Sequence, residues 1–96
     1  IAGGKDKGGS YKVLADQMDK VRALILIGEA KEKINAELGQ YSETYMENDL
    51  SGAVKRALQV AKEGDVVLFS PMCSSFDMFR DYKDRGNQFK TMVDSL

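Results

Sequence analysis

The feature that most constrains this chain is a short apolar run that stops abruptly. Residues 66–69, Val-Val-Leu-Phe, precede Ser70 and Pro71, and small hydroxyl residues follow before an amphipathic segment begins at Phe76. A short apolar run bounded by turn residues is typical of a strand covered on both faces. The pattern predicts a buried parallel strand that feeds a tight loop at the start of a helix. In open α/β sheets, ligands bind just beyond the carboxyl ends of such strands.

A second loop, residues 3–9, has the same kind of position after Ile1 and Ala2, which resemble the end of a strand. It contains four glycines, two lysines and one aspartate. Flexible backbone beside two ammonium groups, at the mouth of a helix whose N-terminus carries positive potential, suits a phosphate or a carboxylate. The spacing matches neither the P-loop nor the Gly-x-Gly-x-x-Gly fingerprint. From spacing alone, a solvated turn without a specific ligand is the other interpretation.

Between and beyond these loops, apolar residues recur with helical spacing or in continuous runs. Tyr11, Leu14 and Met18 share one helical face, whereas residues 21–27 are nearly all apolar, as in a buried strand. We expect further helices over residues 30–38 and 50–61 and at the C-terminus, a weaker strand within 40–46, a short helix from Phe76 and a polar connection over 81–86.

This alternation of strands and helices predicts one α/β domain over residues 1–96. The expected architecture is a three-layer, Rossmann-like fold with a mostly parallel sheet and helices on both faces. Because the chain opens within an apparent strand, we also expect the beginning of the domain to be missing.

The bulk composition excludes several classes of partner and site. With 14 basic and 15 acidic residues the net charge is −1, which gives no general electrostatic reason to expect nucleic acid or an anionic membrane as a partner. A single cysteine and no histidine exclude an internal disulfide and a Cys/His zinc site. The longest apolar run, residues 23–27, is far shorter than the roughly 20 residues that span a bilayer. We expect a cytoplasmic setting.

The loop after residues 66–69 offers hydroxyl, thiol and carboxylate groups. Ser74 and Ser75 can donate hydrogen bonds to a ligand, or Ser75 can cap the following helix. No histidine is present to act as a base, so a serine nucleophile is not expected. Cys73 fits a small buried hydrophobe better than a reactive thiol. Three aspartates between residues 77 and 84 fit a solvated helix face better than a Mg²⁺ site.

Both loops resemble those of a known family. The sequences Ile-Ala-Gly-Gly-Lys-Asp-Lys-Gly at 1–8, Leu-Phe-Ser-Pro-Met-Cys-Ser-Ser-Phe-Asp-Met-Phe at 68–79 and Arg-Gly-Asn-Gln-Phe at 85–89 resemble the C-terminal domain of the Mur ligases. The resemblance is closest to the members that add D-glutamate, and the order and separation of the blocks fit across essentially the whole chain. It implies most of that domain, without its opening strand and helix.

The resemblance also implies a bacterial, cytoplasmic enzyme of peptidoglycan precursor synthesis. In this family ATP, with Mg²⁺, phosphorylates the terminal carboxylate of a UDP-muramoyl substrate, here UDP-N-acetylmuramoyl-L-alanine, and the amine of the incoming amino acid attacks the acyl phosphate. Three domains share this work, and the C-terminal one presents the amino acid. ATP and Mg²⁺ bind mainly on the central domain. The resemblance therefore implies no cofactor, metal ligand or catalytic residue on this chain, and no activity without the N-terminal and central domains.

Four residues match positions that bind the amino acid in the family. Lys7 corresponds to the lysine that engages the side-chain carboxylate of D-glutamate, and Ser75 to the serine that shares this carboxylate. Phe76 supplies backbone and apolar contact, and Tyr82 corresponds to an aromatic residue further along. If Lys5 is the functional ammonium, the loop alignment is off by two. An ammonium, a hydroxyl and a helix N-terminus that converge on a dicarboxylic amino acid agree with this assignment.

Other interpretations stay open. The chain could come from a Mur ligase that adds a different amino acid, or it could be a non-catalytic Rossmann-like binding module. A P-loop upstream in the parent gene would favour a ligase. A sheet edge left without its neighbouring strand also invites self-association through that edge.

Overall fold

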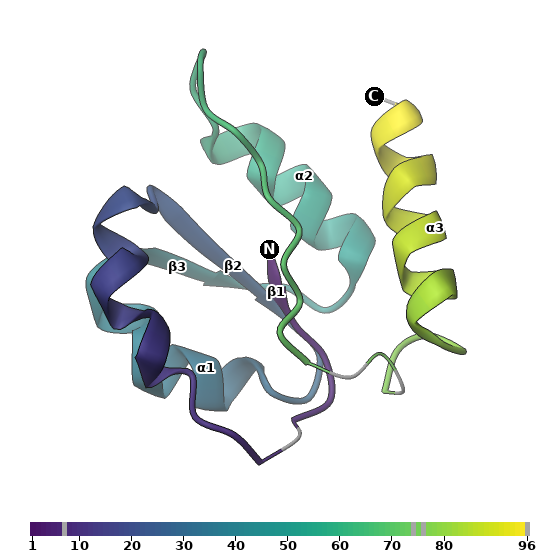
Figure 1. Cartoon of the computed structure of the whole chain (residues 1–96). Coiled ribbons are helices and arrows are strands. Elements are labelled where there is room, and N and C mark those ends of the chain that lie inside the picture. The colour runs from purple at the N-terminus through teal and green to yellow at the C-terminus, as the bar shows by residue number, and fades with distance from the viewer. Residues whose placement is uncertain (7, 74, 76, 96) are drawn as a thin grey trace.

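Parallel strands form the centre of the computed structural model, which describes residues 1–6, 8–73, 75 and 77–95. The strands β1 (Ala2–Gly3), β2 (Ala23–Ile27) and β3 (Glu43–Met46) lie in the order β1-β2-β3 (Figure 1). Ala2 pairs with Leu26, and Ala23 pairs with Glu43. The side chains of β2 are buried from Leu24 onward, because neighbouring strands and both helical layers enclose them. The predicted strand over 21–27 is thus confirmed, as is the weaker one within 40–46.

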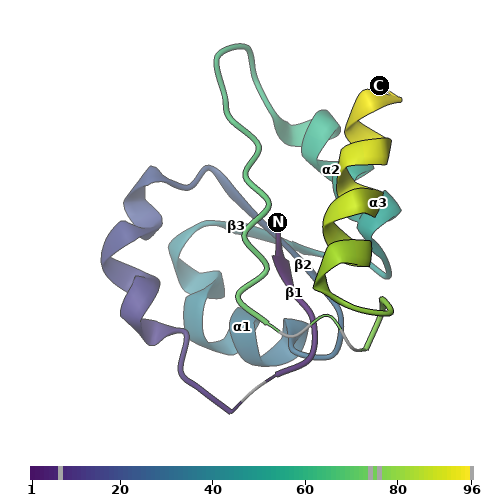
Figure 2. The same ribbon diagram turned by 45° about the vertical axis from the view of Figure 1, so that its right-hand side comes forward.

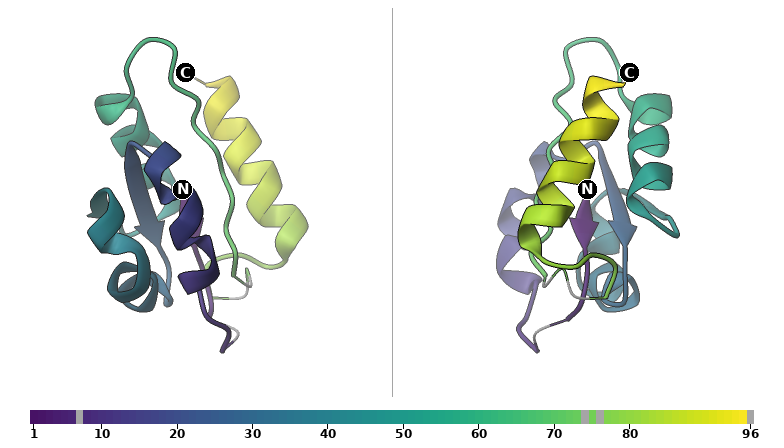
Figure 3. Two further views of the ribbon diagram at one scale, coloured as in Figure 1. Left: turned by 60° about the vertical axis from the view of Figure 1, so that its left-hand side comes forward. Right: turned by 90° about the vertical axis from the view of Figure 1, so that its right-hand side faces the viewer.

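Helices cover both faces of the sheet, as the sequence predicts. The 3₁₀ helix η1 (Lys12–Lys20) and the helix α1 (Lys31–Leu38) lie on one face, and the short 3₁₀ turn η2 (Gly39–Tyr41) leads on to β3. The helices α2 (Leu50–Val60) and α3 (Tyr82–Asp94) lie on the other face. In the right-hand view of Figure 3 the strands lie between η1 and α2. The fold is therefore three-layered α/β and Rossmann-like.

The core has two parts, one on each face of the sheet. The first contains buried side chains from β1 and β2, from η1 and α1 with the residues that cap them, and from the serine-rich segment after residue 70. These are Ala2, Tyr11, Met18, Leu24, Leu26, Ala30, Ile34, Leu38 and Cys73. The second contains Ile25, Ile27, Leu50, Ala53, Val54 and Ala57, with Phe89 and Met92 of α3 packed against it. Alternation along β2 sends Leu24 and Leu26 to one part and Ile25 and Ile27 to the other.

The helix α2 illustrates how closely local sequence specifies local structure. Asp49 precedes it, and its carboxylate accepts a hydrogen bond of 2.7 Å from the backbone N–H of Gly52, which satisfies one free donor of the first turn. Leu50, Ala53 and Ala57 then turn one apolar face to the sheet. Burying a leucine side chain completely contributes about 1.5–3 kcal/mol. The capping aspartate and the apolar face both fit a helix that begins at Leu50, so the predicted helix over 50–61 is confirmed.

Residues 66–69 do not form the buried strand that their composition predicts. Val66 is 88% exposed and Leu68 is 67% exposed. The backbone nevertheless runs beside β1: Ile1 N–H donates to Leu68 O at 2.7 Å, and Ser70 N–H donates to Ile1 O at 2.9 Å (Figure 2). This is the bonding pattern of a parallel pair. The prediction of burial is wrong because residues 66 and 67 extend past the start of β1, and no layer among the described residues covers their side chains.

The C-terminal part also differs from expectation. The predicted polar connection over 81–86 is instead the beginning of α3, because the Asp81 carboxylate caps the helix by accepting from the Asp84 N–H at 2.8 Å. A predicted short helix from Phe76 lies partly outside the described residues. The described residues after it form a turn, in which Phe79 N–H donates to Ser75 O at 2.9 Å.

The order of the elements identifies one special position in the sheet. The chain passes from β1 to β2 to β3 with η1 and α1 on one face, then returns under α2 on the other face to place residues 68–71 on the free side of β1. The direction of winding therefore reverses between β1 and residues 68–71. Ligands of open α/β sheets bind beyond the strand ends at such a reversal.

Within the part of the chain that the structure describes, no helix is long and apolar enough to cross a membrane.

Candidate functional site

The two loops singled out in the sequence meet at this reversal. The first, called here the glycine loop, covers residues 3–9; the second, called here the serine loop, covers residues 70–77. Gly3 N–H donates to Pro71 O at 2.8 Å, and the Tyr11 hydroxyl lies 3.1 Å from the Cys73 sulfur. The contact from Gly3 to Pro71 lies where both loops begin, and the contact from Tyr11 to Cys73 lies just after the glycine loop ends. The two loops are therefore held together at two separate points.

A third loop, between β2 and α1, reaches the same place. Ala30 N–H donates to Gly4 O at 2.7 Å, and Glu29 N–H donates to the Asp77 Oδ2 atom at 2.8 Å. Gly28 has a φ of +77°, and a Cβ atom there would stand 2.7 Å from the Gly4 Cα and 2.7 Å from Asp77 Oδ2. Glycine is therefore required at position 28 for both backbone conformation and close approach.

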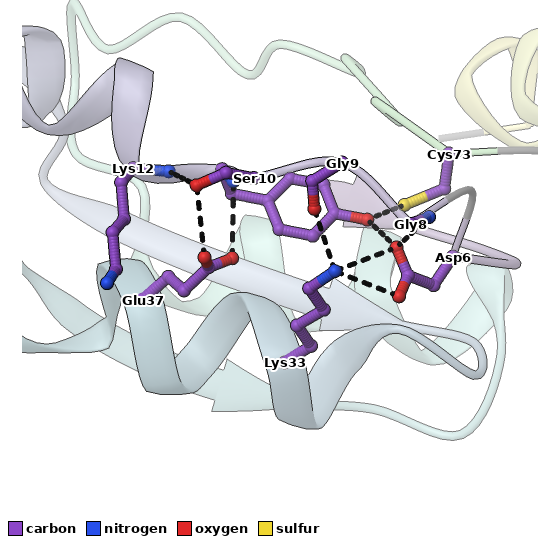
Figure 4. Close-up of polar contacts among 9 residues, drawn as sticks. Asp6, Gly8, Gly9, Ser10, Lys12, Lys33, Glu37 and Cys73 are labelled. Atoms are coloured by element: carbon purple, nitrogen blue, oxygen red, sulfur yellow. Dashed lines mark hydrogen bonds and ion pairs between the residues drawn. The ribbon is translucent and has the colours of Figure 1, made fainter.

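Asp6 is the hub of the polar contacts in the glycine loop (Figure 4). Its Oδ1 atom accepts from Gly8 N–H at 3.0 Å and from the Tyr11 hydroxyl at 3.1 Å, and its Oδ2 atom accepts from Lys33 Nζ at 3.1 Å. The backbone hydrogen bond from Gly8, followed by that from Lys33, lowers the pKa of Asp6 below its ordinary value. Asp6 is therefore ionised at neutral pH and stabilises the turn around it.

The helix α1 holds the end of the glycine loop from outside. Lys33 Nζ also donates to Gly9 O at 2.7 Å. One turn later, Glu37 accepts from the Ser10 hydroxyl and from Tyr11 N–H, both at 3.2 Å. Residues four apart on a helix share one face, so Lys33 binds the glycine loop and Glu37 binds the two residues that follow it (Figure 4).

Tyr11 and Cys73 connect the two loops inside the first part of the core. Both are buried, so the expectation that Cys73 is a small buried hydrophobe is confirmed. Burial raises the pKa of the Cys73 thiol, and burial together with the contacts to Cys73 and Asp6 raises the pKa of Tyr11. Both groups are neutral at physiological pH. Arg85 of α3 adds a hydrogen bond of 2.7 Å to Cys73 O, which ties α3 to the serine loop.

The structure locates the residues predicted to bind an amino acid only in part. Lys7 and Phe76 lie outside the described residues. Ser75 is 4% exposed and begins the turn at the end of the serine loop, whereas Tyr82 is 69% exposed at the start of α3. Among the described contacts, none joins Ser75 to Tyr82. Lys5, the alternative to Lys7, is exposed.

Sequence reasoning missed the contribution of α1 and of the loop before it. Lys33 and Glu37 were indistinguishable from a solvated helix face, because their partners are 24 to 27 residues away in sequence. The available signal was topological. A parallel neighbour of β1 must also end at this edge of the sheet, so the helix that follows it must begin beside the glycine loop.

A cavity of about 330 Å³ lies next to the glycine loop and is lined by Gly9, Ser10, Tyr11, Val13, Leu14, Ser70 and Met72. Neither Ser75 nor Tyr82 lines it. Among the residues that the structure describes, no three His, Cys, Asp or Glu side chains lie where they could share a metal ion.

Comparison with known proteins places this geometry in context. The family model described as "Mur ligase, glutamate ligase domain" matches residues 1–73. The chain is 58% identical over 97 aligned residues to the UDP-N-acetylmuramoylalanine–D-glutamate ligase of Geotalea daltonii and 54% identical to that of Geobacter metallireducens. It is 51% identical over 94 residues to the protein of the same name from Bdellovibrio bacteriovorus.

These alignments cover 97% to 100% of this chain but only 20% to 22% of each relative. The chain therefore spans about a fifth of the length of the curated relatives that it matches.

Proposed function

This chain belongs to the Mur ligase family, as a glutamate ligase domain, and we propose that it presents D-glutamate in an ATP-dependent ligase. The reaction would join the amine of D-glutamate to UDP-N-acetylmuramoyl-L-alanine, as the names of the relatives indicate for those proteins. Residues 1–96 then form most of the amino-acid-binding domain of a three-domain enzyme of peptidoglycan precursor synthesis. Such an enzyme works in the cytoplasm.

The observation that carries the proposal is the meeting of the glycine and serine loops at the reversal of the sheet. Gly3 contacts Pro71, and Tyr11 contacts Cys73, so the segments that carry Lys7 and Ser75 start from one place. An ammonium and a hydroxyl brought to one crevice suit a carboxylate.

We assign four residues to the amino acid. Lys7 and Ser75 bind the side-chain carboxylate of D-glutamate, Phe76 gives backbone and apolar contact, and Tyr82 lines the approach from α3. Lys5 is the alternative to Lys7. Binding by these groups holds the amine of D-glutamate in position for attack, which converts an encounter of two molecules into a reaction within one complex.

ATP, bound with Mg²⁺, would transfer its terminal phosphoryl group to the substrate carboxylate and leave as ADP. The amine of D-glutamate would then displace phosphate and form the amide. Among the described residues no carboxylate cluster suits Mg²⁺. We place both groups on the central domain, as the resemblance to the Mur ligases implies, and we expect the isolated chain to be inactive.

The test is an ADP-release assay of the full-length protein with UDP-N-acetylmuramoyl-L-alanine and a panel of amino acids. D-glutamate should be used well and L-glutamate, D-aspartate and L-lysine poorly. Preference for another amino acid would indicate a ligase of different specificity. Failure to release ADP with any of them, together with tight nucleotide binding by the isolated 96 residues, would indicate a binding module instead.

We also propose that the isolated chain self-associates through residues 66–69. Val66 and Leu68 are exposed, and beside them lies an apolar groove of about 670 Å³ bordered by η1, β2 and the end of α2. In a parallel pair, alternate residues direct their N–H and C=O groups to opposite sides, so those of Phe69 point away from β1. A second copy of the chain can pair with this edge.

A further inference from the structure

We propose that Lys33 is a positioning residue of the amino-acid site: it neutralises the Asp6 carboxylate and fixes the glycine loop, so that the positive charge of the loop acts on the bound amino acid. The inference rests on the function proposed above. It assigns a role to α1, a helix that carries none of the residues expected to touch D-glutamate.

The first step of the argument concerns charge. Asp6 lies directly between Lys5 and Lys7 in the sequence, and these are the two candidates for the carboxylate-binding ammonium. An uncompensated carboxylate in this loop would repel a dicarboxylic ligand and attract the ammonium that should bind it. Lys33 Nζ lies 3.1 Å from Asp6 Oδ2 and provides the compensating charge from a different element.

The second step concerns geometry. Lys33 also donates to Gly9 O, and Gly8 N–H donates to Asp6, so the loop is fixed on both sides of position 7. The pair is partly exposed, with 37% of the Lys33 side chain and 28% of the Asp6 side chain accessible, and an exposed pair alone contributes little to stability. Its value lies in cancelling the charge of Asp6, whereas the hydrogen bond from Lys33 to Gly9 orders the glycine-rich loop before the ligand arrives, which lowers the entropy cost of binding.

The third step concerns the connection to the serine loop. The Tyr11 hydroxyl donates to Asp6 and contacts the Cys73 sulfur, so the residue that Lys33 holds is linked to the other half of the crevice. Lys33 therefore acts on the relative placement of both loops through Asp6 and Tyr11.

The proposal predicts effects of opposite sign for the two partners. In the full-length enzyme, Lys33→Gln should raise the KM for D-glutamate about tenfold, with kcat and the KM for ATP changed less than about twofold. Asp6→Asn keeps an oxygen that can accept from Gly8 and Tyr11 but removes the negative charge, so its KM should equal or fall below that of the wild type. The double variant should recover most of the loss caused by Lys33→Gln.

A purely structural pair would give a different pattern. Both single variants would then raise KM, and the double variant would be no better than either. Lys33→Arg should keep the KM for D-glutamate near the wild-type value, because a guanidinium can donate to both Asp6 and Gly9. Lys31→Gln, on the same helix, is the matched control and should leave both KM values unchanged. Urea unfolding of each variant identifies any rise in KM that comes from misfolding. If Lys33→Gln alone misfolds, the ratio of the KM for D-glutamate of the double variant to that of Asp6→Asn decides between the two patterns.

Failure of this inference can be told from failure of the proposed function. If the wild-type enzyme does not use D-glutamate, the proposed function is wrong. If it does, and Lys33→Gln leaves the KM for D-glutamate unchanged, or Asp6→Asn raises it as much as Lys33→Gln does, the role of Lys33 is wrong.

Discussion

The Asp77 carboxylate and the backbone N–H of Glu29 are joined by a hydrogen bond of 2.8 Å that spans 48 residues of sequence. This bond attaches the end of the serine loop to the turn between β2 and α1. The other Asp77 oxygen, Oδ1, is buried and has no hydrogen-bond partner among the residues that the structure describes. The three loops at the reversal of the sheet are therefore interdependent, and disturbing one should displace the others.

Gly28→Ala tests how tightly these loops are packed. A Cβ atom at position 28 would meet the Gly4 backbone and Asp77, in addition to the strain of a positive φ, so we expect a loss of about 2–5 kcal/mol in the free energy of unfolding. Gly64→Ala is the control, because Gly64 also has a positive φ, +90°, but no atom of the described residues lies within 4 Å of its Cβ position. It should cost about 1 kcal/mol. Equal losses in urea unfolding would show that the approach at Gly28 is unimportant.

Lys7→Ala and Ser75→Ala test the assignment of the carboxylate-binding residues. Hydrogen bonds to charged groups contribute about 1.5–3 kcal/mol, so each variant of the full-length enzyme should raise the KM for D-glutamate about 10- to 100-fold. The KM for ATP should change little. Lys5→Ala distinguishes the two lysines, since only the functional one should give the large effect. A similar rise in KM for both substrates would contradict the assigned roles.

Stability should fall in acid through three carboxylates. Hydrogen bonds from backbone N–H groups lower the pKa of Asp6, Asp65 and Asp84 below the ordinary value of 3.8, and Arg22 adds to the effect at Asp65. A depressed pKa means that the unfolded chain binds more protons in this range. The contribution is therefore complete above about pH 4 and is lost as the pH falls through the folded-state pKa.

The measurement is the urea midpoint of the chain between about pH 6 and pH 2. Asp65→Asn removes one of the three groups, so it should flatten the acid limb relative to the wild type and lower the midpoint at neutral pH. Asp16→Asn, at an exposed position on η1, is the control. An acid limb of unchanged slope in Asp65→Asn would contradict the assignment.

Cys73 should react slowly with alkylating reagents. It is 4% exposed, and burial raises the pKa of its thiol, so both access and the thiolate fraction are low. We expect iodoacetamide at about pH 8 to modify the folded chain much more slowly than a free cysteine, and to modify the urea-unfolded chain at the ordinary rate. Mass spectrometry over time gives both rates. Rapid labelling of the folded chain would mean that the serine loop opens.

Self-association of the isolated chain should depend on the exposed edge. Val66→Lys places a charge on this edge and should shift the sedimentation of the concentrated chain from dimer to monomer. Val13→Lys is the matched control, because Val13 is 78% exposed but lies on η1. A wild-type chain that stays monomeric at high concentration would contradict the proposed self-association through residues 66–69.

The sequence predicted those elements whose signals are local. The buried run of β2 and the cap and stripe of α2 each depend on residues within a dozen positions, and both are confirmed. Residues 66–69 carry an equally apolar pattern, yet burial requires covering elements, and local sequence does not show whether these are present. The start of α3 was mistaken for a connection because the signal of a single capping aspartate, Asp81, was outweighed by polar composition.

The candidate site shows the same division. Its loops were recognised from glycine, lysine and serine content, and their contact through Tyr11 and Cys73 agrees with the expectation that they meet. The role of Lys33 depends on a partner 27 residues away, and only the topology of the sheet brings the two together. Pairwise polar contacts of this kind have no periodicity that a sequence can reveal.

The pairing of Ile1 with Leu68 has a consequence for the order of folding. The two residues are 67 positions apart, so β1 acquires its second neighbour only when the last third of the chain has arrived. Closing so long a loop costs entropy before any contact compensates for it, and contacts of this range slow folding. During synthesis β1 emerges before β2 and β3, yet it gains this second neighbour after both of them. We therefore expect the contact between the two loops, from Tyr11 to Cys73, to form after β2, β3 and the helices that follow them.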